Sequence, residues 1–247
     1  MNHELIMGIP VDHITYESVL EDVNNHLLAG TKKMTIASVN PQIIVESKKY
    51  PEAVNFLEKS THRIPDGIGI VLASKLTGGK IKERVTGFDL MIKLLENGNN
   101  NKRSAFFYGA KPEILGAALK NIELKYPNLV IAGGIDGYTT MTEEEVVEQI
   151  NRTSPDFLFV AMGFPRQELW LNRNVSKLDV KIFQDVGGSF DVLSGTVKRA
   201  PKFFLDYHME WLYRSLSNPK RIGRIFQLPV FLMKSVWWKI FEANNLL

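Results

Sequence analysis

The sequence has no cysteine, which excludes disulfide bonds and zinc sites built on cysteine. It also lacks a P-loop of the form G-x-x-x-x-G-K-[ST] and a complete G-x-G-x-x-G after a strand, so both common glycine-rich phosphate motifs are missing. No D-x-D occurs, and the five histidines show no spacing that suits a metal ion. These absences disfavour a dinucleotide enzyme and a diphosphate held by a metal.

Long apolar runs are also scarce. The most apolar stretch, residues 225–241, is interrupted by Gln227, Pro229, Lys234 and Lys239. Because a membrane-spanning helix needs about 20 apolar residues, we expect this stretch to lie on a membrane surface or to pack on protein. The start, MNHELIMGIPVDH, has no basic segment before an apolar run, so we expect no signal peptide. Without a signal peptide the protein is expected in the cytoplasm, and the absence of cysteine fits that reducing compartment.

Charge is distributed unevenly along the chain. The net charge is +3, but residues 198–247 hold nine Lys and Arg against three Asp and Glu, which leaves the remainder slightly acidic. A basic, apolar segment beside a nearly neutral body indicates an anionic partner.

Apolar runs that look like strands alternate with helical patterns through most of the chain. These runs are rich in β-branched and aromatic residues and lie at 34–39, 104–109, 129–134, 156–163 and 180–188. Asn40-Pro41 and the pair Thr142 and Glu145 are typical helix starts between them. This alternation predicts an α/β fold with an open, mostly parallel, Rossmann-like sheet and helices on both faces.

The strand signals stop near residue 200. The following residues predict helices, and Asn218-Pro219 indicates that one of them restarts after a break. We therefore expect two parts, an α/β catalytic body at 1–195 and a basic, apolar helical appendage at 196–247.

Polar residues follow several of the predicted strands. Ligands of open parallel sheets bind beyond the carboxyl ends of the strands, so these residues are candidates for a single site. The candidates are Ser38, Asn40, Asp66, Gln167, Glu168 and Asp191.

Each candidate also has a purely structural explanation. Asn40 suits the N-cap of the next helix, and Asp66 suits the N-cap of a helix that begins near Gly67. Gln167 and Glu168 suit a solvated helix face. The residue pattern by itself leaves these alternatives open.

Five ordered motifs carry a resemblance that covers about residues 5–225. They are PDGIGIV (65–71), ERVTGFDL (83–90), GFPRQELW (163–170), GGSFDVLSGTVKRAP (187–201), and MEWLYR with NPKRIGR (209–224). In this order they resemble the WecG/TagA/CpsF family of bacterial glycosyltransferases. Ser38 stands where the family tends to show threonine, which preserves a hydroxyl group.

The resemblance implies an inverting hexosyltransferase that needs no metal and no cofactor. The family's TagA branch, which the chain resembles most, moves N-acetylmannosamine from a UDP donor to the 4-hydroxyl of GlcNAc-diphospho-undecaprenol in wall teichoic acid linkage-unit synthesis. Asp66 is implied as the catalytic base. The expected substrate-binding residues are Ser38, Asn40, Arg84, Gln167, Asp191, Arg214, Arg221 and Arg224, the last three addressing the diphosphate.

The expected partners are a UDP-sugar, a lipid-linked GlcNAc diphosphate and the inner leaflet of the bacterial cell membrane, with no nucleic acid. The protein is thus expected to be cytoplasmic and peripheral on that membrane. The tail residues expected to enter the membrane interface are Leu228, Phe231, Leu232, Val236, Trp237, Ile240 and Phe241.

Several alternatives remain at this point. The appendage suits a homo-oligomer interface or ordinary core packing as well as a membrane. The donor could be another UDP-hexose, such as UDP-N-acetylmannosaminuronic acid, which the WecG branch uses. The chain could also be a non-catalytic, membrane-associated nucleotide-binding module. A dehydrogenase or methyltransferase is disfavoured, because the glycine fingerprint is missing.

Overall fold

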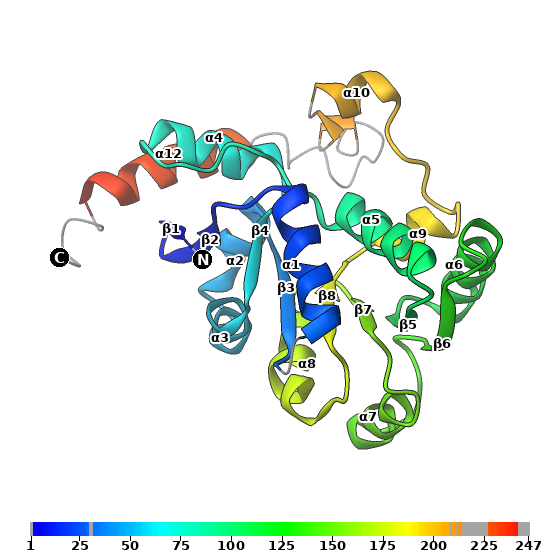
Figure 1. Ribbon diagram of the computed structural model, residues 1–247. Coiled ribbons are helices and arrows are strands. Elements are labelled where there is room, and N and C mark those ends of the chain that lie inside the picture. The colour runs from blue at the N-terminus through cyan, green and yellow to red at the C-terminus, as the bar shows by residue number, and fades with distance from the viewer. Residues whose placement is uncertain (1, 30–31, 208, 211, 214–226, 242–247) are drawn as a thin grey trace.

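The computed structural model describes residues 2–29, 32–207, 209–210, 212–213 and 227–241 (Figure 1). Its centre is a parallel sheet with the strand order β4-β3-β8-β7-β5-β6. The strands are β3 (Met34–Val39), β4 (His62–Pro65), β5 (Ser104–Gly109), β6 (Val130–Ile135), β7 (Phe157–Ala161) and β8 (Ile182–Asp185). The predicted α/β class with an open parallel sheet is confirmed.

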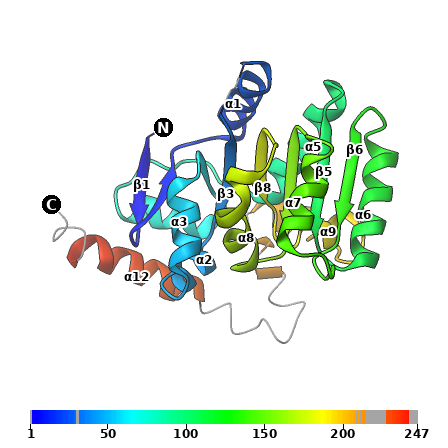
Figure 2. The same ribbon diagram turned by 90° about the horizontal axis from the view of Figure 1, so that it is seen from below.

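Helices cover both faces of this sheet (Figure 2). One face carries α1 (Tyr16–Ala29), α5 (Gly87–Asn100), α6 (Pro112–Lys125) and α9 (Ser189–Leu193). The other carries α2 (Pro41–Ser47), α3 (Pro51–Lys59), α7 (Glu143–Asn151) and α8 (Arg166–Asn174), which the short 3₁₀ turn Val175–Lys177 follows. Thr142 and Glu145 form the predicted capping box at the start of α7.

Two hydrophobic cores result from the alternation of side chains along the buried strands. In β5, Phe106 and Tyr108 enter the core under α2, α3 and α8, whereas Ala105 and Phe107 enter the core under α1, α5 and α6. Each fully buried phenylalanine contributes about 1.5–3 kcal/mol to folding. Both faces are therefore apolar, which explains why these strands read as continuous apolar runs.

A hairpin that the strand pattern did not indicate lies beside β4. It pairs β1 (His3–Ile6) with β2 (Ile9–Asp12) in antiparallel register. The fully buried carboxylate of Asp12 accepts hydrogen bonds from the Arg63 backbone N–H at 2.6 Å and from its guanidinium at 2.7 Å. This ion pair fixes the edge strand from which Asp66 emerges.

The described part of the appendage contains α10 (Lys202–Asp206) and α12 (Gln227–Phe241), and α12 lies along α4 (Ile68–Leu76) (Figure 1). Phe231 and Trp238 are buried, and Phe231 belongs to the core that contains Ile43 and Ile70. No helix in the described ranges is long and apolar enough to cross a bilayer. Asn218-Pro219 lies outside the described residues.

This packing corrects the set of tail residues expected at a membrane. Phe231 is buried, and Leu228 and Leu232 pack against the core of the body, so in this arrangement they face protein. The exposed apolar side chains of α12 include Val230, Met233 and Trp237. They follow one another at helical spacing, so they share one side of the helix.

Candidate active site

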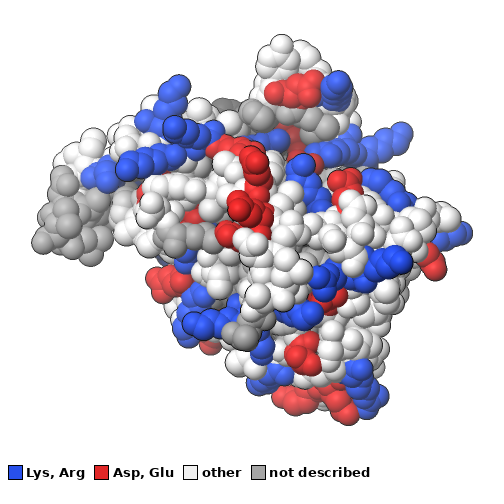
Figure 3. Space-filling model, viewed as in Figure 1, with Lys and Arg blue, Asp and Glu red and all other residues white. Residues whose placement is uncertain are grey.

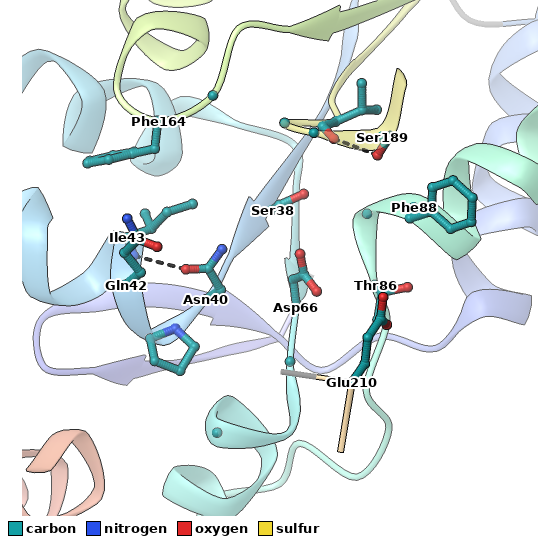
Figure 4. A pocket seen from close by; sticks show the side chains of 18 of the residues that line it. Ser38, Asn40, Gln42, Ile43, Asp66, Thr86, Phe88, Phe164, Ser189 and Glu210 are labelled. Atoms are coloured by element: carbon teal, nitrogen blue, oxygen red, sulfur yellow. Dashed lines mark hydrogen bonds between the residues drawn. The ribbon is translucent and has the colours of Figure 1, made fainter. Parts of the chain in front are cut away.

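A cavity of about 670 Å³ opens where β3, β4, β7 and β8 end (Figure 4). The residues that line it come from the segments directly after these strands, from the first turns of α4 and α5, and from the appendage. Its position agrees with the rule that open parallel sheets bind ligands beyond the carboxyl ends of their strands.

Asp66 leaves the sheet at the centre of this cavity. The register pairs Val39 with Pro65, so the chains after β3 and β4 enter the cavity together. The Asp66 N–H donates to the Val39 carbonyl at 2.8 Å, and Gly67 turns the backbone with φ +99°. Figure 4 shows the carboxylate between Asn40 on one side and Thr86 with Glu210 on the other.

The structural explanation for Asp66 as a helix cap is wrong. The N-cap of α4 is Gly67, and no side chain makes a capping hydrogen bond there. The carboxylate therefore points into the cavity without serving the helix that follows it, which favours a chemical role.

Asn40 caps a helix and also lines the cavity. Its Oδ1 accepts a hydrogen bond from the Ile43 N–H at 3.0 Å, which confirms the N-cap of α2. The same residue lines the cavity beside Asp66. Because the cap occupies its oxygen, its Nδ2 group is the part suited to contact a ligand.

Ser38 and the start of α5 approach each other closely. A Cβ at Gly87 would lie only 2.8 Å from the Ser38 Oγ, so a larger residue at this position would displace the Ser38 hydroxyl. Thr86 caps α5 by accepting from the Asp89 N–H. The chain can thus bring Thr86, Gly87 and Phe88 into the cavity wall.

Arg84 lines the cavity on the segment between α4 and α5. Its Nε is buried and contacts no hydrogen-bond acceptor within the described part of the chain. It also borders a second hollow of about 480 Å³ that Lys82 and Lys93 help to line. The predicted cation is therefore present at the site.

Gln167 lies in the cavity wall, but its amide is directed at the protein. Its Oε1 accepts from the N–H groups of Gly163 at 3.1 Å and Gly187 at 3.0 Å, and its Nε2 donates to Glu168 at 2.9 Å. Gln167 and Glu168 are 3% and 0% exposed, so the solvated-face explanation is wrong. Gln167 joins the loops after β7 and β8.

The structure does not bring all predicted residues together. Asp191 lies on α9, and it is absent from the cavity lining although its neighbours Ser189 and Val192 are part of it. Arg214, Arg221 and Arg224 lie outside the described residues.

Several lining residues were missed by the sequence analysis. Phe88, Phe164, Ser189 and Glu210 line the cavity, and each lies within one of the five motifs. Membership of these motifs is the sequence signal that could have pointed to these four residues. Gln227 and Leu228 also line it, and only the packing of α12 on α4 brings them there.

The electrostatics of the cavity suit an anion despite its acidic residues. The helices α4 and α5 begin at its wall, and the N–H groups of a first helical turn attract negative charge. Arg84 adds a positive charge. Within the described ranges, no group of three or more His, Asp or Glu side chains is arranged to hold a metal ion.

A doubly covered parallel sheet with a polar cavity at its carboxyl edge is the arrangement in which open α/β proteins bind ligands beyond their strands. The model of the WecG/TagA/CpsF family of glycosyl transferases matches residues 4–245. The chain belongs to this family.

Curated relatives support the same assignment. The chain is 36% identical to an N-acetylglucosaminyldiphosphoundecaprenol N-acetyl-beta-D-mannosaminyltransferase of Bacillus spizizenii, across 90% of this chain and 88% of that protein. It is 35% identical to the protein of the same name from Bacillus subtilis, across 94% and 91%. The corresponding Staphylococcus aureus protein is 32% identical, across 93% and 90%.

Proposed function

We propose that this glycosyltransferase moves N-acetylmannosamine from UDP-N-acetylmannosamine to the 4-hydroxyl of GlcNAc-diphospho-undecaprenol, with inversion and without a metal, in teichoic acid linkage-unit synthesis. The names of three relatives at 32–36% identity support the donor sugar and the acceptor. The observation that carries the proposal is the Asp66 carboxylate in the centre of a cavity at the carboxyl edge of the sheet.

Asp66 acts as the general base of a single displacement. The acceptor oxygen forms a bond to the anomeric carbon of the donor while the bond from that carbon to the UDP oxygen breaks. The acceptor proton passes to the Asp66 carboxylate, and UDP leaves from the opposite face of the sugar. General-base assistance of this kind contributes about 10²–10⁴-fold in rate.

The leaving diphosphate requires positive charge in a site that excludes water. The first turns of α4 and α5 and the Arg84 guanidinium supply part of it. We assign the remainder to Arg214, Arg221 and Arg224 of the appendage. Glu210, Gln227 and Leu228 line the cavity, which supports a site that the appendage at 196–247 completes for the body at 1–195.

The appendage also places the enzyme on the inner leaflet, close to its lipid acceptor. Figure 3 shows Lys and Arg side chains gathered over the arm that α4 and α12 form, and exposed lysines there include Lys75, Lys234 and Lys239. Basic residues near an anionic surface contribute about 1 kcal/mol each, and tryptophan favours the interface. Val230, Met233 and Trp237 supply the apolar contact, and self-association through the same face is the alternative.

The proposed function is tested by incubating the protein with UDP-N-acetylmannosamine, UDP-N-acetylmannosaminuronic acid and UDP-GlcNAc, together with a soluble lipid-diphosphate-GlcNAc analogue. We expect transfer from UDP-N-acetylmannosamine alone, with a β-linked product identified by NMR. Transfer from another donor would place the chain in a different branch of the family. Binding of UDP without any transfer would favour the non-catalytic module.

Transfer is expected to continue when divalent ions are removed with EDTA. Helix N-termini and arginine side chains neutralise the diphosphate in this site, so chelation removes nothing that the reaction uses. The check is the initial rate before and after EDTA treatment and dialysis. A rate that collapses and returns on addition of Mg²⁺ or Mn²⁺ would show that a metal carries this charge.

A further inference from the structure

Two carboxyl groups that the proposed reaction does not use lie directly behind the cavity. Glu168 is in the first turn of α8 and Asp185 is the last residue of β8, and both are 0% exposed. A buried ionised carboxylate is strongly unfavourable unless a cation or hydrogen bonds compensate it. No lysine or arginine contacts either group among the described residues.

Each carboxyl group has one satisfied oxygen and one unsatisfied oxygen. Gln167 Nε2 donates to Glu168 Oε1 at 2.9 Å, and the Ser38 N–H donates to Asp185 Oδ1 at 2.8 Å. Glu168 Oε2 and Asp185 Oδ2 are buried, and no donor of the described residues reaches them. Because carboxylates only accept hydrogen bonds, the two groups can satisfy each other only when one of them carries a proton.

The electrostatic surroundings keep a proton on this pair. Burial raises the pKa of Glu168 to about 7, against the hydrogen bond from Gln167 and the neighbouring Asp185 carboxyl group, which lower it. Burial also raises the pKa of Asp185, and the negative charges of Glu168 and Asp66 raise it further. Among the charged residues in the described part of the chain, Asp66, which follows β4, is the one besides Glu168 whose charge shifts the pKa of Asp185.

We propose that Glu168 and Asp185 share one proton at neutral pH and that this pair positions the walls of the active site around Asp66. Glu168 orients the Gln167 amide, whose oxygen holds the backbone N–H groups of Gly163 and Gly187. Asp185 holds the backbone of Ser38. The pair thus connects the ends of β3, β7 and β8. This inference rests on the proposed function only for those tests that measure sugar transfer.

The shared proton also sets the charge behind the cavity. With one proton the pair carries a single negative charge, and without it the pair carries two, next to Asp66 and to the site of an anionic donor. Like charges this close repel, so loss of the proton weakens binding of the donor diphosphate. The KM for the donor should therefore rise above neutral pH while kcat changes less.

The decisive comparison is between Glu168→Gln and Glu168→Leu, with Glu123→Gln on the exposed side of α6 as the matched control. Glutamine can accept from Gln167 and donate to Asp185, which reproduces the singly protonated pair, whereas leucine removes both contacts. At pH 7 we expect Glu168→Gln to stay within about threefold of the wild-type rate and Glu168→Leu to lose about 30-fold or more, because buried polar groups lose their partners. The alkaline rise in donor KM should be absent from Glu168→Gln.

Two measurements test the pair without any sugar transfer. The folded pKa of Glu168 lies above its ordinary value of 4.5, so the stability that its protonated form provides is lost as pH rises toward about 7. As the pH is raised from about 5 to about 8, the melting temperature of Glu168→Gln should therefore rise relative to that of the wild type. Amide hydrogen exchange at Gly163 and Gly187 should accelerate in Glu168→Leu and stay slow in Glu168→Gln.

The outcomes separate this inference from the proposed function. If the wild type transfers no sugar but both measurements behave as stated, the pair stands and the proposed reaction is wrong. A melting difference that does not change with pH would overturn the shared proton. Equal rates and equal exchange in the Gln and Leu variants would overturn the positioning role.

Discussion

The Asp66→Asn variant is expected to lose turnover by about 10²–10⁴-fold, the usual contribution of a general base. Asparagine has nearly the same shape as aspartate but cannot take the proton of the acceptor hydroxyl. The backbone of residue 66 is held by the Val39 carbonyl, so the substitution leaves the end of β4 in place. Steady-state transfer with the soluble acceptor and calorimetric binding of UDP measure the two effects separately.

Affinity for UDP should stay within about threefold, because only an interaction specific to the transition state is removed. Since Gly67 and not Asp66 occupies the N-cap of α4, the substitution should not remove a helix cap, and the melting temperature of the variant is measured alongside its turnover. Asp179→Asn, which makes the same chemical change at an exposed site before β8, is the matched control. A variant that retains more than about a tenth of the wild-type rate would exclude Asp66 as the base.

Removal of residues 196–247 is expected to reduce turnover by at least about 100-fold and to abolish binding to anionic liposomes. The cut takes Glu210, Gln227 and Leu228 out of the cavity wall, together with the three appendage arginines. The sheet and nearly all of both cores belong to the remaining body, so it should still fold. It should melt at a lower temperature, because loss of a buried aromatic such as Phe231 costs about 3–5 kcal/mol.

The full-length double variant Met233→Gln with Trp237→Gln separates membrane binding from completion of the site. Both side chains are exposed on α12, so their replacement leaves the packing of Phe231 intact. This variant should float poorly with anionic liposomes and still use the soluble acceptor at nearly the wild-type rate.

A truncated protein as fast as the full chain would show that the appendage is not part of the active site. An unchanged flotation profile together with a smaller oligomer would assign the exposed face of α12 to self-association.

The α/β class was predictable because it depends on local periodicity. The runs at 34–39 and 104–109 coincide with β3 and β5, and the other three overlap β6, β7 and β8. Strand β4 has only four residues, and the hairpin at the N-terminus depends on the long-range pair of Asp12 with Arg63, so neither has a clear local signal.

The candidate site was predictable in part for a related reason. Ser38 lies near the end of β3, Asn40 and Asp66 follow directly after β3 and β4, and parallel strands deliver such residues to one edge. The sequence could not decide between a cap and a catalytic role at Asp66, because that choice depends on whether the side chain or Gly67 serves α4. The structure places Gly67 at the N-cap, which leaves the catalytic role of Asp66 as the proposal.

Local patterns in the sequence were enough for the class of fold, for the edge of the sheet at which the candidate site lies, and for the motifs that mark the family. Three features emerged from long-range packing alone: Glu168 is buried beside Asp185, Gln167 turns its amide toward Gly163 and Gly187, and α12 covers α4 with Phe231. The physical reason is that the solvation of a side chain, and hence its charge and its role, is set by residues distant in the chain. Helical and strand periodicities are local and can be read directly, whereas burial is a property of the whole packed molecule.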